Sequence, residues 1–223
     1  MICVSLVEED LTSAFALLPQ AEKVADLIEI RLDALREPAV APFLNLARKP
    51  LLFTFRAKEE GGFKEVPLEE RLSFLKEAAK QGAFAVDLEL SAGLEACREL
   101  RAFCKKAKLV LSFHDFSKTP PFEELTKIIK ELKNAGAEVG KLVTTACTYE
   151  EALIPLNLIK LAQRRFSFPL ISFAMGPKGR FSRVISLLLG APWSYASFPG
   201  KAKAAPGQIP APLMRELLAH FSA

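Results

Sequence analysis

Metal-binding residues are scarce in this chain. It contains two histidines, His114 and His220, and four cysteines that form no C-x-x-C pair and have no histidine beside them. Zinc sites and redox motifs are built from such clusters, so we expect neither. Cysteines that stand apart from one another, as these four do, are typical of buried thiols in a reducing compartment.

Long apolar runs are also missing. No stretch approaches the roughly 20 residues that cross a membrane, and the N-terminus lacks the basic, apolar and small-residue order of a secretion signal. The formal net charge is only +4 in 223 residues and is spread along the chain. That argues against nucleic acid as a partner but suits a small anionic molecule. We therefore expect a cytoplasmic protein without membrane contact.

The pattern that is present is a regular alternation. Eight short apolar or β-branched runs, each followed by a helical stretch, start roughly 23 to 33 residues apart. This spacing, in a chain long enough for one large core, predicts a single α/β domain over residues 1–223, a (β/α)8 TIM barrel. The predicted strands are 2–6, 27–32, 51–56, 84–90, 109–114, 139–146, 170–175 and 193–198.

Local motifs mark the start of two helices. Thr148, with Glu151 three residues later, forms a capping box that predicts a helix N-terminus. Thr119 before Pro120 predicts a second N-terminus, with the threonine as the N-cap and the proline at the first helical position.

Polar side chains recur at every second position within several predicted strands. Neighbouring side chains of a strand point to opposite faces, so these residues share the face that turns into the barrel. Their acidic and basic members nearly balance, as buried charge requires. We therefore predict a polar barrel interior. The residues are Glu29, Arg31, Asp33, Thr54, Arg56, Asp87, Glu89, Ser112, His114, Lys141 and Thr145.

Lys141 is the most informative of these residues because it lies inside an apolar run. Burial of a lysine lowers its pKa and yields a neutral amine that attacks carbonyl groups. The simpler interpretation is a strand-edge lysine whose tip reaches water. For His114, on the preceding strand, the simpler interpretation is a core histidine with satisfied hydrogen bonds. Glu60 precedes two glycines that also fit an ordinary turn.

The order and spacing of these motifs resemble those of the type I 3-dehydroquinate dehydratases, the Schiff-base enzymes of the shikimate pathway. The likeness covers nearly the whole chain, and so many separate motifs in one order exceed what chance produces. It rests on residues 29–33, 53–56 with 60–62, 87–89, 112–116 with 118–120, Lys141, Met175 with Gly179, Ser182 with Arg183, and 205–208.

This resemblance implies a role for each catalytic candidate. Lys141 forms a Schiff base with the ring ketone of 3-dehydroquinate, and the resulting iminium is the electron sink, so no cofactor and no metal are implied. His114 is the general acid and base, with Glu60 as the carboxylate that pairs with it. The resemblance also implies a homodimer.

The substrate contacts are implied in the same way. Arg183 corresponds to the arginine that holds the substrate carboxylate, a pairing that a planar guanidinium makes well. The other implied contacts are Glu29 and Arg56 for the ring hydroxyls, Gln208 from the loop before the last helix, and Ser5 and Arg31 in lesser positions.

Two other functions remain open at this point. One is a Schiff-base aldolase or transaldolase acting on a phosphorylated sugar, with residues 176–180 as the phosphate loop. The other is a barrel that serves as a non-catalytic binding module, which we would expect to have lost Lys141 or His114.

One position departs from the family pattern. Ala204 stands where many members carry a serine or threonine, so one hydroxyl contact to the substrate is absent. A single hydrogen bond contributes on the order of 1 kcal/mol. We expect Ala204→Ser to lower the KM for 3-dehydroquinate several-fold in a steady-state assay; an unchanged KM would count against this contact.

Overall fold

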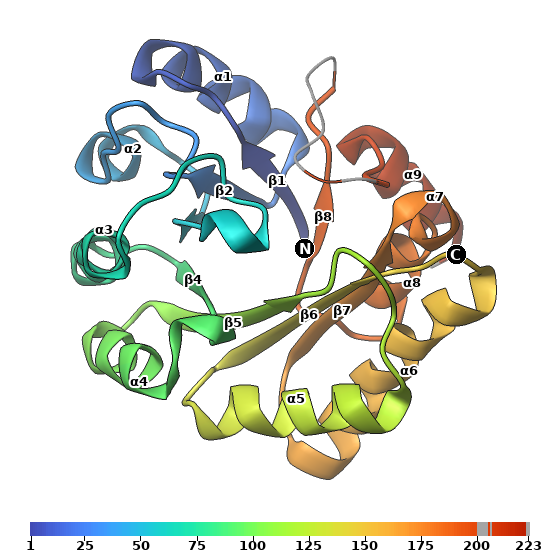
Figure 1. Cartoon of the computed structure of the whole chain (residues 1–223). Helices are drawn as coiled ribbons and strands as arrows, with labels where there is room; N and C mark the ends of the chain where they lie inside the picture. The colour runs from blue at the N-terminus through green and yellow to red at the C-terminus, as the bar shows by residue number, and fades with distance from the viewer. Residues whose placement is uncertain (200–204, 206, 222–223) are drawn as a thin grey trace.

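Eight parallel strands form a nearly closed barrel in the computed structural model, which describes residues 1–199, 205 and 207–221. The strand order is β7-β6-β5-β4-β3-β2-β1-β8, and the helices surround the strands (Figure 1). The predicted (β/α)8 TIM barrel is thereby confirmed. The strands are β1 Ile2–Leu6, β2 Leu27–Arg31, β3 Leu51–Thr54, β4 Ala85–Glu89, β5 Lys108–His114, β6 Val139–Thr145, β7 Leu170–Met175 and β8 Ser194–Ala196.

A helix follows every strand, with short 3-10 turns after β3 and β4 and two helices between β7 and β8. Thr148 and Glu151 form the predicted capping box. The helical segments are α1 Leu11–Val24, α2 Ala41–Leu46, η1 Lys58–Glu60, α3 Leu68–Gln81, η2 Leu90–Ala92, α4 Leu94–Phe103, α5 Phe122–Asn134, α6 Tyr149–Phe166, α7 Gly176–Gly179, α8 Ser182–Leu188 and α9 Ala211–Phe221.

The predicted cap at Thr119 is wrong. Helix α5 begins at Phe122, and Pro121 occupies the N-cap. A residue that precedes a proline is disfavoured in the helical region, so two consecutive prolines delay the start of the helix. The Thr119 hydroxyl instead donates to the carbonyl oxygen of Thr145 and forms a second hydrogen bond with the Thr144 hydroxyl, each at 2.9 Å. The threonine thereby fastens the loop after β5 to the end of β6.

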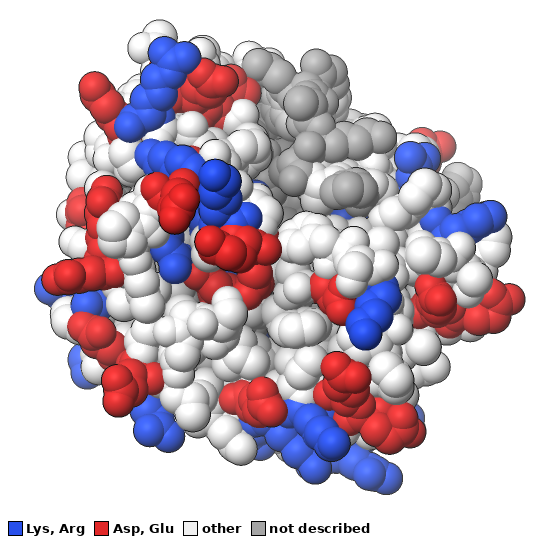
Figure 2. All heavy atoms as spheres, in the orientation of Figure 1, with Lys and Arg blue, Asp and Glu red and all other residues white. Residues whose placement is uncertain are grey.

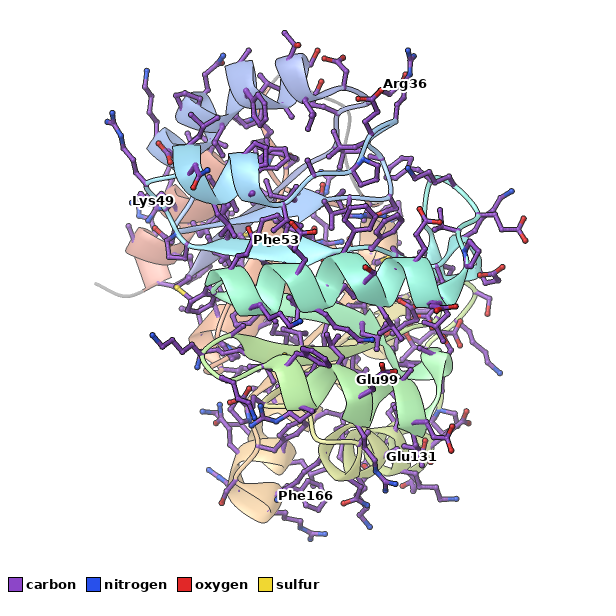
Figure 3. All side chains as sticks on the ribbon, turned by 90° about the vertical axis from the view of Figure 1, so that its left-hand side faces the viewer. Arg36, Lys49, Phe53, Glu99, Glu131 and Phe166 are labelled. Atoms are coloured by element: carbon purple, nitrogen blue, oxygen red, sulfur yellow. The ribbon has the colours of Figure 1, made fainter. Side chains whose placement is uncertain are left out.

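The main core lies between the barrel and its helices. Phe53 on β3 is fully buried there, with its ring 6.5 Å from that of Phe43 in α2. Figure 3 shows Phe53 inside the molecule, whereas Arg36 and Lys49 project from its edges. The outward faces of the strands are therefore apolar, as the alternation predicts.

The barrel interior is polar in one part only, which corrects the prediction of a polar interior. The inward side chains at the amino ends of the strands form an apolar floor, defined as Cys3, Leu27, Leu52, Ala85, Val110, Val139, Ile171 and Trp193. Inward side chains fill a barrel in layers, and a layer sealed from water and ligand must be apolar. The charged residues begin one layer above this floor.

The surface carries both signs of charge, interspersed over the face in Figure 2. No single-sign patch of the kind that binds nucleic acid dominates this face. Of the helices that the structure describes, none has the length and apolarity to span a bilayer.

The packing of Phe53 predicts a large loss of stability on truncation. Removal of a fully buried ring leaves a cavity, so Phe53→Ala should lower the free energy of unfolding by about 3–5 kcal/mol. Urea unfolding followed by circular dichroism measures this. Leu46→Ala, at a side chain that is 56 % exposed, is the matched control and should change it by less than about 0.5 kcal/mol. Equal midpoints for both variants would contradict the assignment of this core.

Candidate active site

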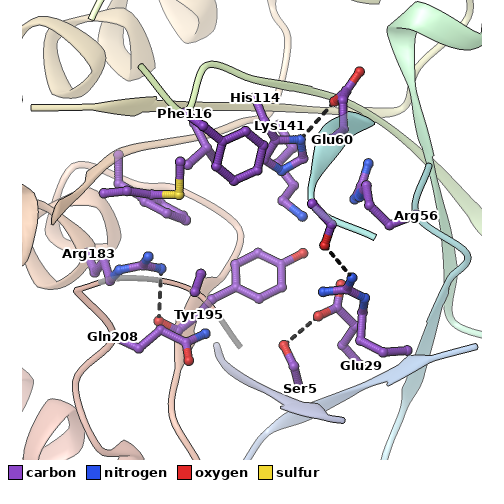
Figure 4. Close-up of a pocket in the computed structure, with 16 residues that line it drawn as sticks. Ser5, Glu29, Arg56, Glu60, His114, Phe116, Lys141, Arg183, Tyr195 and Gln208 are labelled. Carbon is purple, nitrogen blue, oxygen red and sulfur yellow. Dashed lines mark hydrogen bonds and ion pairs between the residues drawn. The ribbon is translucent and has the colours of Figure 1, made fainter. Parts of the chain in front are cut away.

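One pocket at the carboxyl ends of the strands collects the nine residues that the sequence analysis assigns to catalysis and substrate binding (Figure 4). The parallel barrel directs these strand ends to one face, where barrel enzymes carry their sites. Arg183 comes from α8 and Gln208 from the segment before α9. The predicted residues that line it are Ser5, Glu29, Arg31, Arg56, Glu60, His114, Lys141, Arg183 and Gln208.

Lys141 lies deep in this pocket and does not reach the surface. It is only 6 % exposed, and its Nζ donates to Asp87 Oδ2 at 2.9 Å. The interpretation as a strand-edge lysine that reaches water is therefore wrong. The carboxylate compensates the ammonium charge that burial would otherwise penalise.

Asp87 is held by several donors at once. Arg56 Nη2 lies 2.8 Å from Asp87 Oδ2, and the Ser112 hydroxyl donates to Asp87 Oδ1 at 2.6 Å. Burial by itself raises the pKa of the Asp87 carboxyl, but Arg56 and Lys141 outweigh burial and hold the pKa well below its usual range. Asp87 is therefore an ionised carboxylate throughout the physiological pH range.

A second buried carboxylate, Glu89, lies next to the ion pair of Asp87 and Arg56. Glu89 lies 3.6 Å from Arg56 Nη1 and also accepts a hydrogen bond from Arg71, which reaches inward from α3. Sequence reasoning missed Arg71, because a charged residue on an amphipathic helix normally faces water.

His114 is oriented by Glu60. Its Nδ1 lies 3.0 Å from Glu60 Oε2, and the Ser91 hydroxyl donates to the other oxygen of Glu60. Burial lowers the pKa of His114 well below 6.5, and Arg56 and Lys141 lower it further. With Nδ1–H donated to Glu60, the neutral ring keeps the lone pair on Nε2, so it can accept a proton there.

Glu29 and Arg31 lie side by side on β2 but have different surroundings. Glu29 accepts hydrogen bonds from the hydroxyls of Ser5 and Thr54, the latter at 2.8 Å. Arg31 forms a two-point ion pair with Asp33, at 2.9 and 2.6 Å, and donates to the carbonyl oxygen of Gly61 at 3.2 Å. Arg31 thus fixes the loop that carries Glu60, whereas Glu29 offers a carboxylate to the pocket.

Arg183 and Gln208 occupy the opposite side of the pocket and point toward one another (Figure 4). Arg183 is 1 % exposed, and its guanidinium carbon lies 4.3 Å from the centre of the Phe173 ring. Burial lowers the pKa of the Arg183 guanidinium to about 9. An anion bound beside Arg183 would compensate the positive charge of the buried guanidinium and so favour its charged form.

The comparisons with known proteins agree along the whole chain. Residues 2–223 match the family described as Type I 3-dehydroquinase. The chain belongs to the type I 3-dehydroquinase family. The 3-dehydroquinate dehydratase of Desulfotalea psychrophila is 37 % identical over 224 residues, covering 99 % of this chain and 97 % of that protein.

Solved structures of the family have the same fold. The 3-dehydroquinate dehydratase of Geobacillus kaustophilus superposes with a TM-score of 0.91 at 30 % identity, covering 99 % of this chain and 90 % of that one. The type I enzyme of Clostridium difficile, solved with covalently modified comenic acid, gives 0.90 at 26 % identity, with coverages of 99 % and 91 %.

The glycines of residues 176–180 are explained by packing and by backbone conformation. A Cβ atom on Gly179 would lie 2.5 Å from the carbonyl oxygen of Ala174, a contact that real structures do not show, so this glycine allows close backbone approach. Gly176 has a φ of +84°, in the left-handed region that favours glycine. The segment needs no phosphate to account for its composition.

Sequence reasoning gave no role to several residues of the pocket. Val143, Phe173 and Tyr195 occupy inward-facing positions of their strands, which the two-residue alternation of side chains identifies. Phe116, whose ring stacks on His114 with centroids 5.9 Å apart, lies in a loop that no periodicity covers. Ala204 lies outside the described residues. Among those described, no cluster of His, Cys, Asp and Glu could hold a metal ion.

The burial of His114 predicts its behaviour on titration. As the pH falls through 6.5, its ring signals in an NMR titration should keep the positions of the neutral form, because its pKa lies well below 6.5. His220→Gln leaves one histidine and so assigns the signals. Because the unfolded chain takes up this proton more readily, folding stability should decrease as the pH falls below about 6.5. A His114 midpoint at or above 6.5 would contradict this environment.

Proposed function

We propose that the chain dehydrates 3-dehydroquinate to 3-dehydroshikimate through a Schiff base on Lys141, a hydro-lyase step of the shikimate pathway. The observation that carries the proposal is a buried lysine, paired with Asp87, in one pocket with a neutral histidine and a buried arginine. Membership of the type I 3-dehydroquinase family supports the same reaction.

The first step uses the nitrogen of Lys141. As the neutral amine it attacks the ring ketone, and loss of water from the adduct leaves an iminium with a positive charge on nitrogen. Asp87, 2.9 Å from this nitrogen in the free protein, is positioned to compensate that charge. The iminium draws electrons from the neighbouring carbon and so acidifies its hydrogen.

The second step uses His114. Its Nε2 accepts the proton from C2, and the same ring returns a proton to the departing hydroxyl, which leaves as water. Glu60 holds the ring through Nδ1 and stabilises the imidazolium that forms between these transfers. Hydrolysis of the product imine then releases 3-dehydroshikimate and regenerates the amine.

Recognition of the substrate is divided between two sides of the pocket. Arg183 binds the carboxylate, since a buried guanidinium gains most from an anion. Glu29 and Arg56 bind the ring hydroxyls from the opposite wall, with Gln208 as a further polar contact and Ser5 and Arg31 as supporting residues.

We also propose that the protein is a cytoplasmic homodimer. The homodimer rests on the family resemblance, and the reducing compartment on four free cysteines, of which Cys147 is exposed. Light scattering during gel filtration measures the mass, for which the chain of 24.5 kDa is the unit.

Borohydride trapping tests the proposed function. Reduction in the presence of 3-dehydroquinate should leave a stable adduct on the peptide that carries Lys141, detected by mass spectrometry. Lys141→Ala should lose both the adduct and turnover. His114→Ala should lower kcat by at least about 100-fold and still form some adduct, because it removes proton transfer and leaves the nucleophile.

Three results would contradict the proposal. One is turnover of 3-dehydroquinate by folded Lys141→Ala. The second is an adduct with a phosphorylated sugar aldehyde or ketone but none with 3-dehydroquinate, which would favour an aldolase-type reaction. The third is that the folded wild-type protein forms no adduct with any carbonyl compound, which would favour a non-catalytic barrel.

A further inference from the structure

We propose that Tyr195 is a positioning residue for Lys141, and that the face of its ring stabilises the positively charged forms of the lysine nitrogen. These forms are the ammonium of the free protein and the iminium of the reaction. The inference rests on the proposed function for its consequence in catalysis, but the contact itself exists without substrate.

The geometry is that of a cation–π contact. Lys141 Nζ lies 4.4 Å from the centre of the Tyr195 ring, within the roughly 6 Å over which a cation is attracted by an aromatic face. Tyr195 is only 4 % exposed, and Lys141 is similarly buried. Such contacts strengthen when water is excluded, so this one counts among the stronger examples.

Two neighbouring aromatic side chains hold the Tyr195 ring in place. Trp193 Nε1–H donates to the Tyr195 hydroxyl oxygen at 3.2 Å, and Trp193 is fully buried in the apolar floor. Phe173 packs beside the tyrosine, with ring centres 6.2 Å apart. A ring fixed at its hydroxyl and along its side keeps its face toward Lys141 and loses little entropy when the cation forms.

Other charged and titratable groups also face Lys141. Asp87 on β4 is its direct partner, and Arg56, two residues after β3, contacts the same carboxylate. His114 on β5 and Cys3 on β1 interact electrostatically with Lys141 at longer range. Replacement of Tyr195 by a neutral residue leaves the charges of these groups as they are, so a change in the titration of Lys141 reports on the ring.

Phe173 supplies an internal comparison. Its ring lies under Arg183, at 4.3 Å, in the same way that Tyr195 lies under Lys141. The two rings are neighbours and both line the pocket, yet each contacts a different cation. A general disturbance of the pocket would affect both cations alike, whereas the proposed role of Tyr195 is confined to Lys141.

The first experiment needs no substrate. Reductive methylation of Lys141 with formaldehyde and cyanoborohydride is measured against pH by mass spectrometry of its peptide. Because the ring favours the ammonium, Tyr195→Leu should shift half-maximal modification to lower pH. Tyr195→Phe keeps the face and should shift it little, and Phe173→Leu should leave it in place. An unmoved midpoint in Tyr195→Leu would overturn the proposal.

The second experiment measures catalysis. In Tyr195→Leu the amine is more available but the iminium is less stable, so kcat for 3-dehydroquinate should fall about tenfold while KM changes less. Phe173→Leu should instead raise KM, through Arg183. The opposite directions expected for amine reactivity and turnover in Tyr195→Leu distinguish a cation–π contact from loss of packing, which would lower both.

A third set of variants keeps the shape of the ring. Fluorine atoms weaken the negative face of an aromatic ring with little change in size, so Tyr195→Phe is compared with versions that carry increasing numbers of ring fluorines. The kcat should decrease at each step, and a constant kcat would refute the role of the face even if Tyr195→Leu fails to fold. If the wild type neither turns over 3-dehydroquinate nor forms an adduct, the proposed function fails, while the methylation profile still decides the contact.

Discussion

The pocket depends on the pairing of the buried Lys141 ammonium with the Asp87 carboxylate. Neither charge could be buried alone, because removal of one partner of a buried ion pair costs about 3–5 kcal/mol. Asp87 also holds Arg56 at 2.8 Å, and Arg56 in turn lies beside Glu89. One carboxylate thus aligns the Lys141 nitrogen with the Arg56 guanidinium, and it joins β4 to β6 and to the segment after β3.

The cations of the pocket are balanced by two kinds of group. Strands β2 and β4 and the turn η1 after β3 supply the carboxylates Glu29, Asp87, Glu89 and Glu60, whereas β7 and β8 supply the aromatic rings of Phe173 and Tyr195 beneath Arg183 and Lys141. A ring attracts a cation without neutralising it and without repelling an incoming anion. In the proposed function, this arrangement leaves Arg183 able to bind a substrate carboxylate, which a further acidic residue at its side would oppose.

The alternation of polar and apolar residues was enough to predict the barrel and the inward face of each strand, because both follow from the two-residue period of β-structure. It did not predict how deep the polar layer extends, and the apolar floor was missed for that reason. Arg71 on α3 and Phe116 in a loop were missed because neither residue lies in a strand, where the two-residue alternation of side chains applies. The roles of Arg183 and Gln208 came from the family resemblance, since no local pattern of a helix or loop shows which residue turns toward a distant strand.

The apolar floor closes the amino end of the barrel in the part of the chain that the structure describes. Leu27, Ile171 and Trp193 are fully buried there and leave the opening at the carboxyl ends of the strands. In the proposed reaction the water that hydrolyses the imine must therefore arrive through the same opening as the substrate. While the ring of the bound molecule occupies that opening, it restricts the access of bulk water to the covalent intermediate.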